Sequence, residues 1–179
     1  MPGYETKCEI VTIGDISLEI TSLKDKSQFY DPEGKAKNLG ISSTSWPISG
    51  LIWPSGILLA KIILKMDLAQ LRVLEVGCGI GVASLVAAYK KADITASDYH
   101  PIVENILLKN RDVNQLGKID FIAGNWNYPI GNDGKFDLII GSDLLYERGY
   151  CELLSRYLDC HLKQDGKIIL IDPRRRTAA

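Results

Sequence analysis

Short apolar segments alternate with longer segments of helical period through the last two-thirds of the chain. The clearest helical pattern is amphipathic, with apolar side chains recurring on one face: Ile102, Val103, Ile106 and Leu107. The strand-like runs between such segments are compact and rich in Val, Ile and Leu, which is typical of strands covered on both faces. The pattern predicts strands at 72–76, 94–96, 119–123, 136–140 and 167–171, with helices at 82–90, 102–116 and 152–162.

This order of elements predicts the α/β class. Strands joined through helices by short connections require crossover units, so we expect a Rossmann-like, doubly wound, mainly parallel sheet with helices on both faces. Ligands of such sheets bind at the carboxyl ends of the strands, near the point where the strand order reverses. Residues that directly follow the predicted strands are therefore the candidates for chemistry.

The beginning of the chain has a different texture. Two β-prone runs, 9–13 and 16–21, flank Gly14-Asp15 and predict a β-hairpin. The polar stretch 24–38 then has the composition of a loop.

Residues 46–56 are dense in Pro, Gly and Ser and lead into a predicted helix that ends near Met66, with Ser55 as a candidate N-cap. We expect one globular domain made of a hairpin-and-loop extension at 1–45 and a ligand-binding domain at 46–179.

Composition and charge exclude several classes of protein. The 179 residues are 46% hydrophobic and 24% charged, as in soluble globular domains. The net charge of -1 argues against a nucleic-acid partner, because phosphate neutralisation needs a basic surplus or a basic face. No apolar run approaches the ~20 residues of a membrane span, and the N-terminus lacks a signal-peptide pattern. We therefore expect no membrane partner. The 4 cysteines form no CxxC or metal-site spacing, so we also expect no metal, and free thiols in the cytoplasm.

The first strand of the alternating region ends in the sequence EVGCGIG, residues 75–81, in which three glycines alternate. Glycine lets the backbone turn tightly and approach a ligand that a Cβ would exclude. A dinucleotide fingerprint would read GxGxxG, but counting from Gly77 or Gly79 places Val82 or Ser84 at the third position. The loop thus predicts a ligand that is not a pyrophosphate.

A carboxylate follows the next strand. Asp98 lies about twenty residues beyond the first loop glycine, where a ribose-binding carboxylate belongs. A carboxylate accepts hydrogen bonds from both ribose hydroxyls, and its charge strengthens each bond. The alternative is that Asp98 caps the helix that starts near Ile102. With the glycine loop before it, we favour the ribose interpretation.

Four segments near the predicted strand ends are distinctive when taken in series. They are LIWPSG at 51–56, VLEVGCGIG at 73–81, GNW at 124–126 and FDLIIGSDLLY at 136–146. Together they resemble class I S-adenosylmethionine (SAM)-dependent methyltransferases, and more narrowly the methyltransferase family 16 group of protein lysine methyltransferases. The glycine segment alone indicates only the superfamily, whereas the preceding Trp, the Asn-Trp pair and the D-x-x-Y in series are more specific.

The resemblance implies SAM as the cofactor and a role for each matching residue. The backbone of Gly77, Cys78 and Gly79 would meet the methionine end, and Glu75 would orient the loop or reach the ammonium. Asp98 would hold the ribose. The other implied cofactor-binding positions are Trp53 in the pocket wall, Asn125 and Trp126 at the adenine, and Ser142. Core packing is the alternative for both tryptophans.

Methyl transfer to an amine is an in-line displacement that needs an aligned, dehydrated and unprotonated nucleophile. A lysine with its ordinary pKa of ~10.4 must first lose a proton. The resemblance places Asp143 and Tyr146, from the D-x-x-Y segment, at this acceptor site as catalytic residues. Asp143 would hold the amine, and Tyr146 would donate a hydrogen bond to Asp143 or form one side of the amine's binding site. In the alternative interpretation Asp143 caps the next helix and Tyr146 lies at the surface.

Three functions are compatible with these motifs. The first is a SAM-dependent protein methyltransferase with a lysine acceptor. The second is a small-molecule N-methyltransferase, and the third is a methyltransferase-like binding module without activity. The cofactor motifs do not separate them, because a fold and a cofactor site say little about the acceptor.

The end of the sequence departs from the family. By resemblance the sheet would close with an antiparallel hairpin after the strand at 167–171, and the sequence as given lacks that hairpin. The strand would then be an open edge, and such an edge is a template for pairing. We expect either a homodimer through this strand or a reduced stability that SAM partly restores by mass action.

Overall fold

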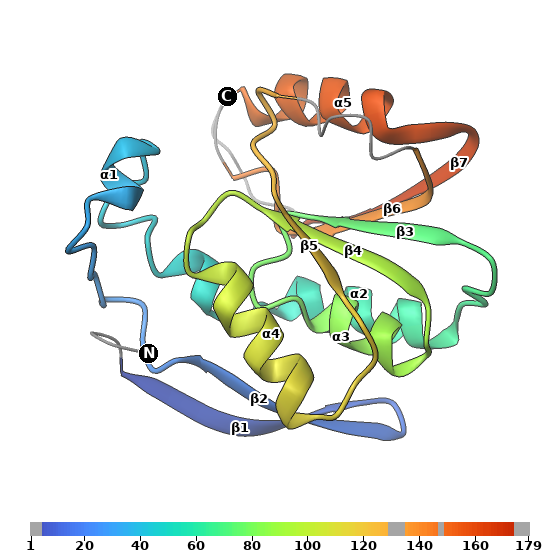
Figure 1. The fold of residues 1–179 in the computed structure, drawn as a ribbon, viewed down its shortest axis with the longest axis horizontal. Helices are drawn as coiled ribbons and strands as arrows, with labels where there is room; N and C mark the ends of the chain where they lie inside the picture. Colours follow the sequence, from blue (N-terminus) through green and yellow to red (C-terminus); the bar gives the residue numbers. More distant parts are fainter. Residues whose placement is uncertain (1–4, 129–134, 147–148, 174–179) are drawn as a thin grey trace.

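The computed structural model describes residues 5–128, 135–146 and 149–173, and its centre is a five-stranded sheet in the order β5-β4-β3-β6-β7 (Figure 1). All four neighbouring pairs are parallel. The strands are β3 (Arg72–Val76), β4 (Asp93–Asp98), β5 (Asp120–Ala123), β6 (Phe136–Ser142) and β7 (Leu162–Ile171). The order reverses between β3 and β6, so the predicted doubly wound parallel sheet is confirmed.

Helices cover both faces of the sheet. Figure 1 shows α2 (Pro54–Lys65), α3 (Val82–Tyr89) and α4 (Val103–Val113) on one face and α5 (Tyr150–His161) on the other. Successive side chains of a strand point to opposite faces. Val73 accordingly joins the buried cluster beneath α2, α3 and α4, and Leu74 joins the cluster beneath α5. This alternation is why apolar residues of β3 are buried on both faces of the sheet.

The start of α2 corrects one prediction. Trp53 occupies the N-cap position, and Pro54 is the first helical residue. Proline suits that position because its missing N–H would have no partner there and its φ is already helical. Ser55, the predicted N-cap, lies inside the helix and is buried.

The predicted hairpin is present as β1 (Thr6–Ile13) and β2 (Ile16–Leu23), paired antiparallel. Gly14 in the turn has a φ of 62°, a left-handed value that glycine adopts at little cost. Ile16, Leu18 and Ile20 alternate along β2 and are buried in the same cluster as α2, α3 and α4. The hairpin is therefore an integral part of the core on that side.

Asn110 of α4 and Asn114, the C-cap residue of that helix, satisfy the outer edge of β2. The amide of Asn110 accepts from Thr21 N (2.8 Å) and donates to Thr21 O (3.0 Å). One helical turn later, Asn114 accepts from Glu19 N and donates to Glu19 O, both at 2.8 Å. Side chains at i and i+4 share a helix face, so the two amides replace the hydrogen bonds of a neighbouring strand.

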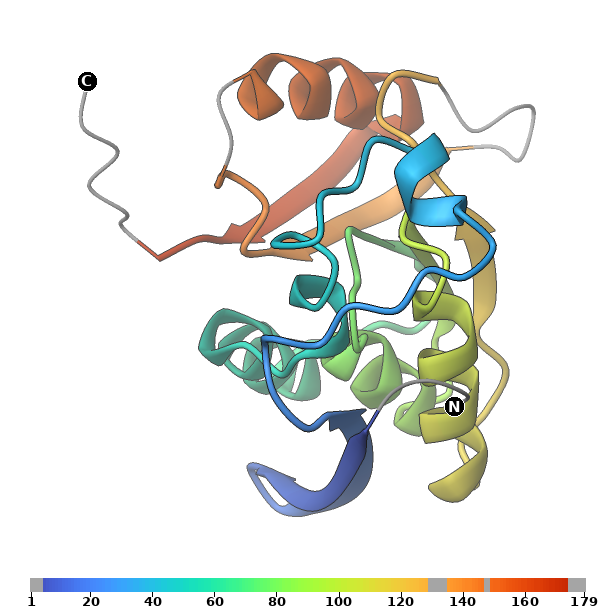
Figure 2. The same cartoon turned by 90° about the vertical axis from the view of Figure 1, so that its left-hand side faces the viewer.

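A long segment connects the hairpin to α2. It runs across the front in Figure 2, coloured blue to cyan, and contains α1 (Lys35–Asn38) and the 3₁₀ turn η1 (Ile48–Gly50). The predicted loop at 24–38 thus ends in one short helix. Trp46 anchors the segment because it is 2% exposed, and its ring lies 5.7 Å from that of Phe29 and 4.3 Å from that of His100.

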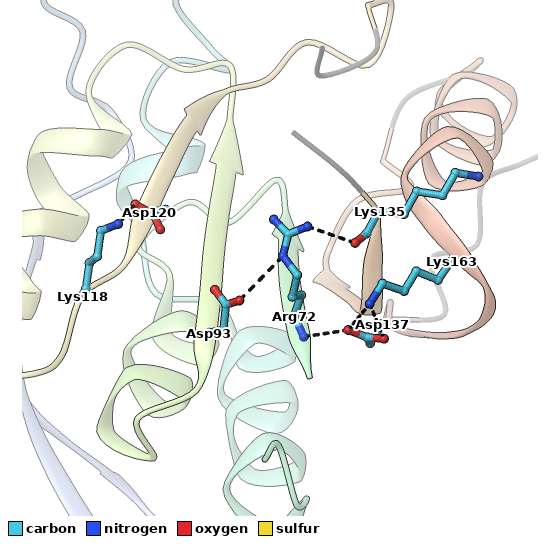
Figure 3. Close-up of polar contacts among 7 residues, drawn as sticks. All are labelled: Arg72, Asp93, Lys118, Asp120, Lys135, Asp137 and Lys163. Atoms are coloured by element: carbon cyan, nitrogen blue, oxygen red, sulfur yellow. Dashed lines mark hydrogen bonds and ion pairs between the residues drawn. The ribbon is translucent and has the colours of Figure 1, made fainter. Parts of the chain in front are cut away.

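Charged residues mark the amino ends of the strands, opposite the carboxyl edge (Figure 3). Asp137 on β6 accepts from the backbone N of Arg72 on β3 (2.9 Å) and from Lys163 Nζ (2.8 Å). The Lys163 ammonium, followed by the Arg72 N–H, lowers the pKa of the Asp137 carboxyl. These contacts tie β6 to both neighbouring strands and leave the opposite edge to the ligand.

Among the described residues, the apolar run at the end of the outer strand β7 packs against the core mainly through one face. Ile169 and Ile171 pack against the cluster that includes α2, while Ile168 is 41% and Leu170 36% exposed. Within the described residues β7 pairs with β6 and with no other strand. The apolar run at 168–171 has the pattern of a strand buried on both faces, but here only its odd-numbered positions are covered.

All 4 cysteines are free thiols. Over the described ranges no helix is both long enough and apolar enough to cross a membrane.

Candidate cofactor and acceptor site

A cavity of about 310 Å³ lies at the carboxyl ends of β3, β4, β5 and β6. Segments far apart in the sequence form its wall, including the connection before α2 and the loops after these strands. Every residue that the sequence analysis singled out for cofactor or acceptor lines it: Trp53, Glu75, Gly77, Cys78, Gly79, Asp98, Asn125, Trp126, Ser142, Asp143 and Tyr146. Their individual roles remain predictions.

The glycine loop after β3 requires glycine for both conformation and space. Gly77, Gly79 and Gly81 have φ values of 58°, 52° and 72°, in the left-handed region. A Cβ on Gly77 would lie 2.6 Å from Leu144 Cδ2, and one on Gly79 would lie 3.1 Å from the carbonyl oxygen of Ser49. The loop is therefore pressed against its surroundings and presents bare backbone to the cavity.

Glu75, at the end of β3, holds the start of α3. Its Oε2 accepts hydrogen bonds from the backbone N (2.8 Å) and the hydroxyl of Ser84. A carboxylate at a helix N-terminus satisfies donors that lack an intrahelical partner. Burial nevertheless raises the pKa of Glu75 to about 7, more than the Ser84 hydrogen bonds lower it. These hydrogen bonds join the end of β3 to the first turn of α3, and the loop-orienting role of Glu75 stays a prediction.

Asp98, at the end of β4, is buried and bonded on both oxygens. Oδ2 accepts from Gly79 N and Oδ1 from His100 N, each at 2.9 Å. Burial raises the pKa of Asp98. A carboxylate has about four acceptor positions, so these bonds leave capacity for a ligand. The N-cap of α4 is Ile102, with no side-chain cap bond, so the alternative of Asp98 as its helix cap is wrong.

Local hydrogen bonds hold two of the residues that line the cavity, Trp53 and Asn125. Trp53 Nε1 donates to Ile48 O at 2.9 Å and so fixes the η1 turn against α2. Asn125 Oδ1 accepts from Asn127 N at 2.9 Å in a turn after β5. Both side chains are partly buried and line the cavity.

Asp143 follows β6 in a strained conformation. Its φ is 57°, which is uncommon for a residue with a Cβ and costs of order 1–3 kcal/mol. Its backbone N donates to Ile171 O (2.9 Å), and Leu145 N donates to Asp172 Oδ2 (2.9 Å), so the end of β7 holds this loop. The N-cap of α5 is Gly149, so the alternative of Asp143 as the cap of α5 is wrong.

Three aromatic rings form one wall beside Asp143. The rings of Trp126 and Tyr150 are 5.3 Å apart at 77°, and those of Tyr150 and Tyr146 are 5.2 Å apart at 74°. Edge-to-face pairs of this kind contribute about 0.5–1.5 kcal/mol beyond area burial. Tyr146 is half-buried rather than at the surface.

Sequence reasoning missed two aromatic residues of the cavity, Tyr99 and Tyr150. Tyr99 directly follows the predicted ribose carboxylate, which was a usable signal. Tyr150 lies four residues beyond Tyr146 but on a different element, at the start of α5, so spacing alone did not place it. His100 lies outside the cavity wall, and its burial lowers its pKa to about 4.

Comparison with known proteins identifies the family. A sequence model described as lysine methyltransferase matches residues 36–179, most of the chain. The chain belongs to the lysine methyltransferase family. The match confirms the resemblance drawn from the four sequence segments.

Individual relatives of this lysine methyltransferase family member are distant. It is 32% identical to a histidine protein methyltransferase 1 homolog of Dictyostelium discoideum, over 59% of the chain and 36% of the relative. It is 31% identical to an electron transfer flavoprotein beta subunit lysine methyltransferase of Xenopus laevis, over 72% of the chain and 53% of the relative. The chain thus spans about a third to a half of these relatives.

Solved structures agree on the fold of this family member. A ribosomal protein L11 methylase from Lactobacillus delbrueckii subsp. bulgaricus superposes with a TM-score of 0.54 at 26% identity. The match covers 67% of this chain and 61% of the methylase chain. A T. thermophilus 16S rRNA methyltransferase, RsmC, solved with AdoMet and guanosine, superposes with a TM-score of 0.67 at 16% identity. The match covers 94% of this chain and 42% of the RsmC chain. The Rossmann-like methyltransferase fold is thereby confirmed.

Proposed function

We propose that this protein is a SAM-dependent methyltransferase that transfers a methyl group to a lysine side chain of a protein substrate. The observation that carries the proposal is that one cavity joins the glycine loop and Asp98 to Asp143 and Tyr146. The family assignment and the relatives described as protein lysine methyltransferases support it.

The cavity fits SAM in the chemistry of its wall. Gly77 and Gly79 let the loop pack closely against Leu144 and Ser49, where a Cβ would clash, and their backbone can meet the methionine carboxylate and ammonium. Asp98 supplies a charged acceptor for the ribose hydroxyls. Trp126 supplies an aromatic surface for the adenine, and Asn125 supplies an amide for its edge. When bound, SAM supplies an electrophilic methyl group on a sulfonium.

The protein's task is to prepare the amine. Asp143 accepts hydrogen bonds from the lysine ammonium, orients it and stabilises the positive charge of the methylated product. Tyr146 and its neighbouring rings exclude water from the approach, which removes a competing hydration shell. The amine loses its proton before attack, since only the free lone pair is nucleophilic.

Two substitutions separate cofactor binding from catalysis. Asp98→Ala should weaken SAM binding by about 1.5–3 kcal/mol, the range for losing hydrogen bonds to a charged group, measured by isothermal titration. Asp143→Asn keeps the shape, removes the charge and should lower methyl transfer far more than SAM affinity. Equal losses of methyl transfer and SAM affinity in Asp143→Asn would assign Asp143 to the cofactor or the fold. Binding of NAD without binding of SAM by the wild type would overturn the proposal entirely.

One specific alternative to lysine exists for the side chain that accepts the methyl group. The Dictyostelium relative is described as a histidine methyltransferase, so a histidine acceptor is the second candidate. Labelled SAM with a proteome lysate, followed by acid hydrolysis, separates methyl-lysine from methyl-histidine. Label that enters only small-molecule pools would support a metabolite methyltransferase, and SAM binding without transfer would support a binding module.

We also propose a cytoplasmic location, which the free thiols support, and a homodimer formed through β7. The support for the dimer is the exposed apolar side chains of Ile168 and Leu170 on an outer strand. Pairing of β7 with its copy would satisfy its backbone and cover part of this apolar surface.

A further inference from the structure

Trp126, Tyr150 and Tyr146 form a row of rings, the aromatic wall, whose position gives it a role beyond contact with the adenine and the exclusion of water. Its rings come from three elements, the loop after β5, the start of α5 and the segment after β6. Consecutive rings lie 5.3 and 5.2 Å apart, and all three line the cavity together with Asp143.

The aromatic wall runs between the two halves of the site. At one end a carbon of the Trp126 ring lies 3.6 Å from where a Cβ on Gly77 would be, beside the glycine loop. At the other end Tyr146 follows Asp143 by three residues. Tyr150 is the ring that contacts both neighbours. An amine held at Asp143 and aimed at a methyl group near the loop therefore passes this wall.

Rings and carboxylates favour different forms of the acceptor. A primary ammonium is strongly hydrated and donates three hydrogen bonds, which suit a carboxylate. Each added methyl removes a donor and weakens hydration while the positive charge remains. Aromatic faces attract such alkylated ammonium groups through their quadrupoles without needing donors. A site with both features retains the acceptor after the first methyl has been added.

We infer that the aromatic wall binds the methylated lysine ammonium and that Tyr150 determines this specificity, so that methylation continues beyond the first methyl group. This rests on the proposed function. In each later round the methylated ammonium first gives up one proton to water. The nitrogen lone pair then forms the new N–C bond while the C–S bond of SAM breaks, and its electron pair stays on sulfur as a neutral thioether.

The test compares a cation with its neutral twin. The probes are Nα-acetyl-trimethyl-lysine methylamide and the analogue whose side chain ends in a tert-butyl group, which has the same shape without charge. Saturation-transfer NMR titrations are run with S-adenosylhomocysteine present. Wild type and Tyr150→Phe should prefer the cation by roughly threefold to thirtyfold. Tyr150→Leu, which keeps an apolar side chain without a π face, should bring the ratio close to one.

Controls decide the remaining outcomes. Tyr89→Leu makes the same change at an exposed site on α3 and should keep the wild-type ratio. An unchanged ratio in folded Tyr150→Leu would overturn the inference. A wild-type ratio of one would overturn it even if the variant failed to fold. Loss of S-adenosylhomocysteine affinity in Tyr150→Leu would place Tyr150 in the cofactor site instead. A wild type that prefers the cation but binds no SAM would refute the proposed function and with it continued methylation, while the ammonium site itself would stand.

Discussion

Replacing Glu75 with glutamine should flatten the dependence of stability on pH. Glu75 is 2% exposed, and burial raises its pKa from 4.5 to about 7. Because the Glu75 carboxyl binds its proton more tightly in the folded protein than in the unfolded chain, Glu75 stabilises the fold most below pH 4.5. That contribution is lost as the pH rises through 7.

The magnitude follows from the two pKa values. A pKa difference of this size corresponds to roughly 3 kcal/mol, most of which falls between pH 5 and pH 8. Glutamine keeps an oxygen for the Ser84 N–H and does not titrate. The difference in free energy of unfolding between wild type and Glu75→Gln should therefore change by roughly that amount across this range.

Urea unfolding without SAM at pH 5, 6, 7 and 8 measures the effect. Asp98 also has a raised pKa and is present in both proteins, so the comparison reports the titration of Glu75 together with its coupling to Asp98. Glu104→Gln, at an exposed position on α4, should retain the wild-type pH profile. Parallel profiles for wild type and Glu75→Gln would show that the buried carboxyl does not carry the proton, and the reasoning from its burial would fail.

Two further predictions concern packing and assembly. Asn110→Ala should lower the free energy of unfolding by about 2–4 kcal/mol, because it leaves a buried N–H and a buried C=O of β2 without partners. Asn114→Ala should lower it by only about 1 kcal/mol, because water can replace the amide there. Similar losses for the two variants in urea unfolding would contradict this prediction. Light scattering with size exclusion should show a dimer for wild type and a monomer for Ile168→Lys, while Ile10→Lys, at a 65% exposed position on β1, leaves the dimer intact. A wild-type monomer at every concentration would exclude pairing through β7.

The sequence by itself determined the succession of elements and the chemistry at the strand ends. Apolar strands and amphipathic helices reflect local periodicity, so β3 was predicted at its observed bounds of Arg72–Val76. The glycines after it were readable because a left-handed φ and close approach both demand glycine. Asp98 and Asp143 were readable because parallel strands bring their carboxyl ends to one edge.

Only the tertiary structure decided which distant side chains meet. Asn110 looked like an ordinary polar helix residue, yet it completes β2 across 89 positions of sequence. Trp126 and Tyr150 belong to different elements, and their contact depends on how α5 packs over the sheet. The exposure of Ile168 and Leu170 on β7 was likewise undecided, since an apolar run does not record whether a neighbour is present to bury it. Such pairings arise from packing between elements, which the period of a single segment does not encode.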